Sequence, residues 1–169
     1  MTFLEMTQAR YSVRKFAATP IEPEKIQTIL AAVRNAPTAH NNQPQKIFVV
    51  QSTEGIASID KCSRGRYNAP VVFVLGYDKS LSWKRKDGYD AGEVDCGILG
   101  THILFAAHEM GLGSCWIALF HPEILKELFQ LPDSYVPVAL IPMGYIAADA
   151  VPFEFHFQRK PLSETVEFK

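Results

Sequence analysis

The stretch DAGEVDCGILGTHILFAAHEM, from Asp90 to Met110, is the longest periodic segment of the chain. Its Ile, Leu, Phe and Ala residues fall on most faces of a helix, which predicts a long helix running through the middle of the fold. Gly111 suits the C-terminal cap of that helix. Gly97 and Gly100 lower helix stability, and such glycines usually mark a close approach of another backbone. An identical helix from a second subunit is one candidate for that backbone.

The N-terminal part of the chain predicts two more helices. Thr2 and Glu5 have the T-x-x-E form of a capping box, and the short helix that they begin should end near Gln8. A second helix should start near Pro23, which is tolerated in a first turn, and stop before Pro37. The apolar stripe of this second helix, at spacings of three and four residues, is Ile26, Ile29, Leu30 and Val33.

Four short β-branched or aromatic runs predict strands: Lys46 to Val50, Val71 to Tyr77, Cys115 to Leu119, and Val136 to Tyr145. We expect one or two helical turns between the first two strands, a helix opened by Pro122, and an interruption of the last strand by its two prolines. The order of these elements predicts an α+β layered domain. The segment after Ala150 is too poor in contiguous apolar residues to pack alone, so it should lie across another surface.

Composition narrows the class of protein. The chain has 169 residues, of which 47% are hydrophobic, and a formal net charge of −1, which fits one globular domain over residues 1–169. A charge near zero argues against bulk nucleic-acid binding. Neither a signal peptide nor a membrane span is evident, so we expect a cytoplasmic protein. The cysteines form no C-x-x-C pair, and Leu112 stands where an H-E-x-x-H zinc motif starting at His108 needs its second histidine, so no metal site is expected.

The segment RYSVRKF, which begins at Arg10, places a charged or hydroxyl side chain at every second position. In an extended chain Arg10, Ser12 and Arg14 line one face, and Tyr11 and Val13 line the other. The first face is typical of an anion site and the second of a core. Any half-buried strand with exposed arginines has the same pattern, so the segment alone does not decide between the two interpretations.

The segment APTAHNNQP, from Ala36 to Pro44, is the second unusual stretch. Asn41, Asn42 and Gln43 offer both donors and acceptors, which suits the edge of a heterocycle that mixes carbonyl and N–H groups, as the flavin pyrimidine does. The alternative is an ordinary polar turn closed by the proline.

Together these motifs resemble the FMN-dependent nitroreductase family. R-x-S-x-R-x-F near the N-terminus is followed by a helix and by A-P-S/T-x-x-N-x-Q-P, and then by a long helix led by Asp95. GLGSCWI at 111–117, PMGY at 142–145 and RKPL at 159–162 complete the order, so the resemblance covers nearly the whole chain. It implies a layered α+β fold with a central, mostly antiparallel sheet flanked by helices. It also implies a homodimer in which each C-terminal tail embraces the partner.

The resemblance also implies a set of cofactor-binding residues. Arg10 and Arg159 would clamp the FMN phosphate, because arginine binds such groups bidentately, and Ser12 would donate beside them. Arg14 would reach the ring, since five extended residues span roughly 13 Å. The backbone N–H near Leu119 would donate to flavin N5. Pro37, Thr38, Asn41 and Gln43 would border the ring from the second subunit.

The activity implied is ping-pong oxidoreduction: NAD(P)H delivers hydride to FMN, and a nitroaromatic, quinone or similar small molecule then takes the electrons. No side chain is named as catalytic, since solvent can supply protons. Two alternatives remain: a specialised flavin enzyme of the same fold, such as a dehalogenase, a dehydrogenase or a flavin-fragmenting enzyme, and a non-catalytic flavin-binding module.

Two segments differ from the family pattern or are open to two interpretations. Many members of the family have a tryptophan where this chain has Gln45. The basic run Trp83 to Lys86 suits either a nicotinamide phosphate or a surface loop.

Overall fold

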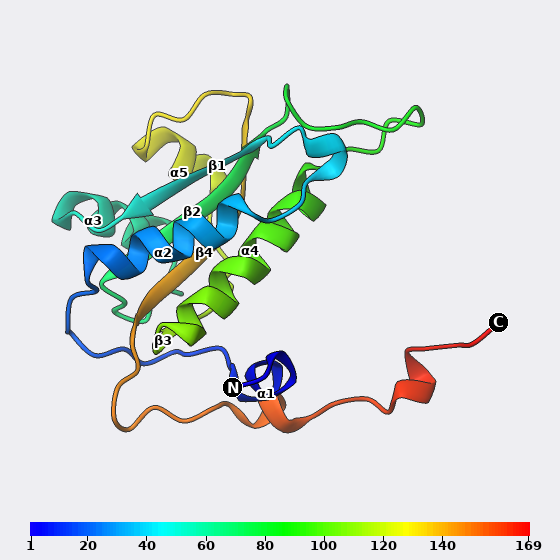
Figure 1. Ribbon diagram of the computed structural model, residues 1–169. Coiled ribbons are helices and arrows are strands. Elements are labelled where there is room, and N and C mark those ends of the chain that lie inside the picture. Colours follow the sequence, from blue (N-terminus) through cyan, green and yellow to red (C-terminus); the bar gives the residue numbers. More distant parts are fainter.

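The computed structural model describes residues 1–169, and its centre is a four-stranded sheet (Figure 1). The strands are β1 (Gln45–Val50), β2 (Val71–Asp78), β3 (Leu112–Ser114) and β4 (Tyr135–Tyr145). They lie in the order β1-β2-β4-β3, and every neighbouring pair is antiparallel. The expectation of an α+β fold around an antiparallel sheet is therefore confirmed.

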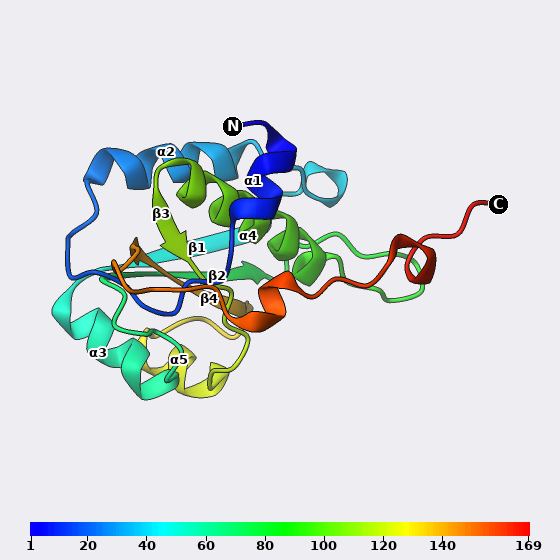
Figure 2. The same cartoon turned by 90° about the horizontal axis from the view of Figure 1, so that it is seen from below.

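The chain has five helices: α1 (Phe3–Ala9), α2 (Pro23–Arg34), α3 (Thr53–Cys62), α4 (Gly92–Glu109) and α5 (Pro122–Leu128). Helices α2 and α4 lie over one face, while α3 and α5 lie over the other (Figure 2). Short 3-10 turns span Ala39–Asn41, Glu154–Phe157 and Leu162–Glu164. No helix is long and apolar enough to cross a bilayer.

Strand β2 is buried on both faces, which explains its nearly unbroken apolar sequence. Because successive side chains alternate, Phe73 and Leu75 join the core under α2 and α4, whereas Val72 and Val74 join the core over α3 and α5. Both cores are thus organised by one strand.

Helix α4 lies where the apolar periodicity predicts it, and Gly111 follows it with a φ of 75°, a conformation that favours glycine. The two glycines inside the helix have different surroundings. A Cβ on Gly100 would overlap Trp116 of the same chain, so a second subunit is not needed to explain this glycine. A Cβ on Gly97 would meet nothing within 4 Å, so this position is on the open side of the helix.

The prediction of a strand from Cys115 to Leu119 is wrong, because the strand is three residues earlier, at β3. The Cys115 N–H donates to the Pro142 carbonyl (3.2 Å), but the proline has no N–H to return, so the regular ladder ends at Ser114. Beyond that point Ile117 and Leu140 form an isolated bridge, with one backbone hydrogen bond in each direction (2.9 and 3.0 Å).

Two other expectations also need correction. Strand β4 is continuous through both of its prolines, with a register shift opposite Leu75 and Gly76 in place of a break. The segment between β1 and β2 carries the ten-residue helix α3, longer than the one or two turns expected. The Ser52 side chain caps the start of this helix by accepting a hydrogen bond from the Gly55 N–H (3.1 Å).

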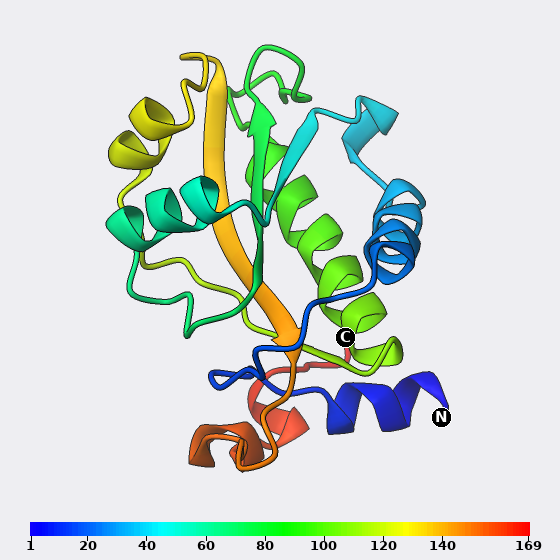
Figure 3. The same ribbon diagram turned by 90° about the vertical axis from the view of Figure 1, so that its left-hand side faces the viewer.

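The C-terminal segment follows β4 past α1 and then runs away from the rest of the chain (Figures 1 and 3). Phe155, Phe157 and Phe168 in this segment are 63%, 73% and 95% exposed. Apolar side chains in such number on an extended segment are typical of a surface that packs against another molecule.

Candidate functional site

A cavity of about 250 Å³ brings together the first and last parts of the chain. Arg10, Ser12, Arg14 and Arg159, all singled out in the sequence, line it. The first three lie on the extended segment after α1, which is fixed by a hydrogen bond from the Val13 N–H to the Ser114 carbonyl (3.0 Å). The fourth follows the 3-10 turn of the tail.

The arginines of this cavity, here called the arginine cluster (Arg10, Arg14 and Arg159), have no carboxylate partner. No ion pair of the chain includes them, and their recorded hydrogen bonds run to backbone carbonyls, such as that of the Arg159 Nη1 with the Gln158 oxygen (2.7 Å). Burial lowers the pKa of Arg10; the nearby Cys115 opposes this shift and the charge of Arg159 adds to it. Three like charges gathered without a carboxylate partner can attract an anion.

Sequence reasoning missed two side chains of this cavity. Tyr11 was expected in the core, but it lines the cavity, and only Val13, 1% exposed, is a core residue. His156 comes from the tail and lies with its ring centroid 6.0 Å from that of Tyr11. The only feature of the sequence that pointed to His156 was its position three residues before Arg159 in an aromatic segment.

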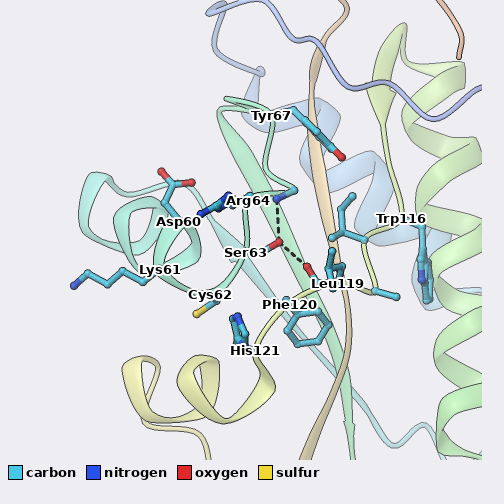
Figure 4. A pocket seen from close by; sticks show the side chains of 13 residues that line it. Asp60, Lys61, Cys62, Ser63, Arg64, Tyr67, Trp116, Leu119, Phe120 and His121 are labelled. Carbon is cyan, nitrogen blue, oxygen red and sulfur yellow. Dashed lines mark hydrogen bonds between the residues drawn. The ribbon is translucent and has the colours of Figure 1, made fainter.

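A second cavity, of about 950 Å³, lies beside the end of α3 (Figure 4). One wall is the end of α3 with the loop that follows it, Asp60 to Tyr67, and the other is the loop from Trp116 to His121. Leu119, the predicted neighbour of flavin N5, lies in the second loop. Because Ser12 pairs with Ser114, the short segment from Ser114 to Leu119 connects the arginine cluster with this larger cavity.

The backbone at Leu119 offers unused donors. The amides of Ala118, Leu119 and Phe120 donate no hydrogen bond within the chain, whereas the Leu119 carbonyl accepts one from the Ser63 hydroxyl (2.8 Å). Three consecutive free N–H groups beside a cavity can bind a ligand that carries acceptor atoms.

The amide-rich loop lies elsewhere, at the N-terminal end of α4, and lines neither cavity. The Ala39 N–H donates to the Asp95 Oδ1 (2.8 Å), and the Thr38 hydroxyl accepts from the Gln43 N–H (3.1 Å). His40, Asn41 and Gln43 all have positive φ values, between 51° and 56°. Such a concentration of left-handed residues is unusual outside functional loops.

This loop and the arginine cluster are at opposite ends of α4 (Figures 1 and 3). The loop is held at Asp95, whereas the Arg10 guanidinium lies 5.9 Å from the ring centroid of Phe105. Ten helical residues separate these two anchors, a rise of roughly 15 Å. Within one chain, the structure therefore brings together only part of the predicted site.

The basic run at Trp83 to Lys86 forms contacts typical of a surface loop. Arg85 pairs with Asp87 (2.8 Å) and lies 4.8 Å from the ring centroid of Tyr89, while the Lys84 Nζ donates to the Lys79 carbonyl (3.0 Å). These contacts favour the interpretation of the run as a surface loop over that of a site for the nicotinamide phosphate.

Known proteins resemble this chain in sequence and in fold. The nitroreductase family matches residues 7–67 and 61–145. A relative from Methanothermobacter thermautotrophicus with the provisional name NADH dehydrogenase/NAD(P)H nitroreductase is 31% identical over 154 residues, covering 87% of this chain and 78% of the relative. An FMN reductase (NAD(P)H) of Bacillus subtilis is 28% identical over 156 residues, covering 80% of this chain and 62% of that protein. A solved nitroreductase family protein from Clostridium difficile 630 has a TM-score of 0.94 and 37% identity, and the match covers 100% of this chain and 99% of that chain. The chain therefore belongs to the nitroreductase family.

Proposed function

We propose that this chain is an FMN-dependent oxidoreductase that uses NAD(P)H to reduce a nitroaromatic, a quinone or a similar small acceptor. The observation that carries the proposal is the arginine cluster, which is assembled from both ends of the chain and has no carboxylate partner. The names of the relatives, NAD(P)H nitroreductase and FMN reductase, support the same cofactor and co-substrate.

The smaller cavity suits the phosphate of FMN. A phosphate dianion would neutralise the mutual repulsion of the arginine cluster, and the planar guanidinium of Arg10 or Arg159 can bind it through two N–H groups. Ser12 adds a hydroxyl donor. His156, on the same wall, can donate a further hydrogen bond through a ring nitrogen.

The segment from Ser114 to Leu119 then leads from the phosphate toward the ring. The free amides of Ala118, Leu119 and Phe120 are donors for the flavin edge near N5. When bound, FMN supplies the hydride acceptor at N5 and a store for two electrons, which makes a ping-pong sequence possible. The chain's own part is to bind and orient the cofactor, and it needs no acid or base because solvent supplies protons.

The proposed complete site requires a homodimer. If two copies pack with their α4 helices antiparallel, the loop of Thr38, Asn41 and Gln43 from one copy comes to the arginine cluster of the other. The open face of α4 supports such packing, because Val94 on it is 52% exposed and Gly97 has free space beside it. The aromatic tail would be buried against the partner. A cytoplasmic location fits the use of NAD(P)H and the three free cysteines.

The first test is spectroscopic. The purified protein should be yellow, the released chromophore should be FMN and not FAD, and NADH or NADPH should bleach it rapidly in the absence of oxygen. A nitroaromatic or quinone should then restore the colour. A colourless protein that does not bind added FMN would refute the proposal, while a flavin that is reduced without turnover of any acceptor would indicate a binding module.

A complementation experiment tests the shared site. One variant combines Arg10→Gln with Arg159→Gln, and the other replaces Asn41 and Gln43 with glycine, which deletes the amides but permits positive φ. Each variant alone should bind FMN poorly. After dissociation and random reassociation of a mixture, half of the dimers are mixed and each has one intact site, so about a quarter of all sites should recover. No recovery would mean that one chain supplies both parts.

A further inference from the structure

The Ser63 hydroxyl connects the two loops that form the larger cavity. Ser63 follows α3 directly and is 7% exposed. Its Oγ accepts a hydrogen bond from the Gly65 N–H (3.0 Å) and donates one to the Leu119 carbonyl (2.8 Å), as the dashed lines in Figure 4 show. The neighbouring backbone adds a second connection, from the His121 N–H to the Cys62 carbonyl (2.9 Å).

This contact determines how one peptide group is turned. The Leu119 carbonyl and the Phe120 N–H belong to the same planar trans peptide, so they point in opposite directions. When Ser63 holds the carbonyl, the N–H is directed away from Ser63. That N–H is one of the free donors described above. Without the hydroxyl, nothing else in the chain donates to this carbonyl, and the peptide loses its fixed orientation.

We propose that Ser63 is a positioning residue: through the Leu119 carbonyl it orients the Leu119–Phe120 peptide as a hydrogen-bond donor to the reacting edge of the flavin. This inference rests on the proposed FMN-binding function. Preorganised donors act most strongly where their direction is fixed before the ligand arrives. The Gly65 N–H contributes to this fixed direction because it donates to the Ser63 oxygen and so restricts rotation of the hydroxyl. The hydroxyl proton then remains directed at the Leu119 carbonyl.

The test compares Ser63→Ala, which deletes the hydroxyl, with Ser63→Thr, which keeps it. Ser58→Ala is the matched control, because the Ser58 hydroxyl bonds only to the Glu54 carbonyl of its own exposed helix turn (3.0 Å). The readouts are the dissociation constant of FMN and that of sulfite, which adds to flavin N5 and reports its electrophilicity. Ser63→Ala should weaken sulfite binding about threefold to tenfold, the effect of one neutral hydrogen bond. FMN binding should change less, because the arginine cluster is intact.

Ser63→Thr should retain sulfite binding close to that of the unchanged protein, and so should Ser58→Ala. Thermal unfolding of the flavin-free variants separates a structural role from a positioning role. If Ser63→Ala lowers the melting temperature but leaves sulfite affinity unchanged, or if the threonine variant loses as much sulfite affinity as the alanine variant, the inference is wrong. Failure of the unchanged protein to bind FMN would instead refute the proposed function, and this inference with it.

Discussion

Replacing Arg10 with glutamine should weaken FMN binding and leave the stability of the flavin-free protein almost unchanged. A hydrogen bond to a charged group contributes about 1.5 to 3 kcal/mol, so the dissociation constant of FMN should rise roughly tenfold to a hundredfold. In the free protein, Arg10 has no carboxylate partner, and both burial and Arg159 disfavour its charge. The substitution removes those costs but also removes the contact of the half-buried guanidinium with Phe105, so we expect little net change in stability.

Fluorescence titrations with FMN and with riboflavin, which lacks the phosphate, isolate the contact. The loss should appear with FMN and be small with riboflavin. Arg34→Gln is the matched control, because Arg34 is exposed at the end of α2 and lines neither cavity. Equal losses for both ligands would mean that Arg10 acts on the ring or on the fold, and an unchanged FMN titration would remove it from the site.

Three further results are expected. Arg159→Gln should reproduce the selective loss of FMN over riboflavin in the same titrations, and a similar loss for both ligands would contradict its role at the phosphate. Gly100→Ala should cost about 1 to 3 kcal/mol in urea unfolding, because the new methyl group overlaps Trp116; an unchanged midpoint would mean that the indole moves freely. Burial and then the charge of Arg10 lower the pKa of His108, so the unfolded chain binds this proton more readily than the folded one. The free energy of unfolding should therefore fall as the pH drops below about 6.5. His108→Gln should make this dependence on pH weaker, as measured from urea midpoints between about pH 5 and 8. An equal pH dependence in both proteins would mean that His108 is not its source.

The elements with local signals could be predicted from the sequence. The Thr2 and Glu5 capping box is formed as expected, with both of its hydrogen bonds present. Helix α2 begins at Pro23 because proline has its φ fixed at a helical value, and α4 ends before Gly111 because glycine readily adopts the positive φ of a C-terminal cap. The order of these elements was enough to identify the layered architecture.

Features that depend on contacts between distant segments could not be predicted. The alternation of side chains puts Tyr11 on the same face as the core residue Val13. In the folded chain, however, the tail forms a cavity over Tyr11 and brings His156 close to its ring. The family resemblance implied that Arg10 and Arg159 come together, and the structure places both in one cavity, but no local pattern around either residue indicates this. Likewise, no local pattern indicates that the loop at Asn41 lies at the far end of α4 from that cavity.

The end of β3 connects fold and site most directly. A proline inside β4 suggests a broken strand when the sequence is considered alone, but the strand continues and its neighbour ends instead, because Pro142 cannot donate to the backbone opposite it. From Cys115 the pairing with β4 is reduced to an isolated bridge at Ile117, and beyond Ile117 the backbone leaves β4, so the amides around Leu119 are not used in the sheet. Ser63 then holds the freed segment from the other side of the cavity. The free donors at Leu119 therefore lie just beyond the last residue paired with β4, on a segment that one hydroxyl of a neighbouring loop holds in place.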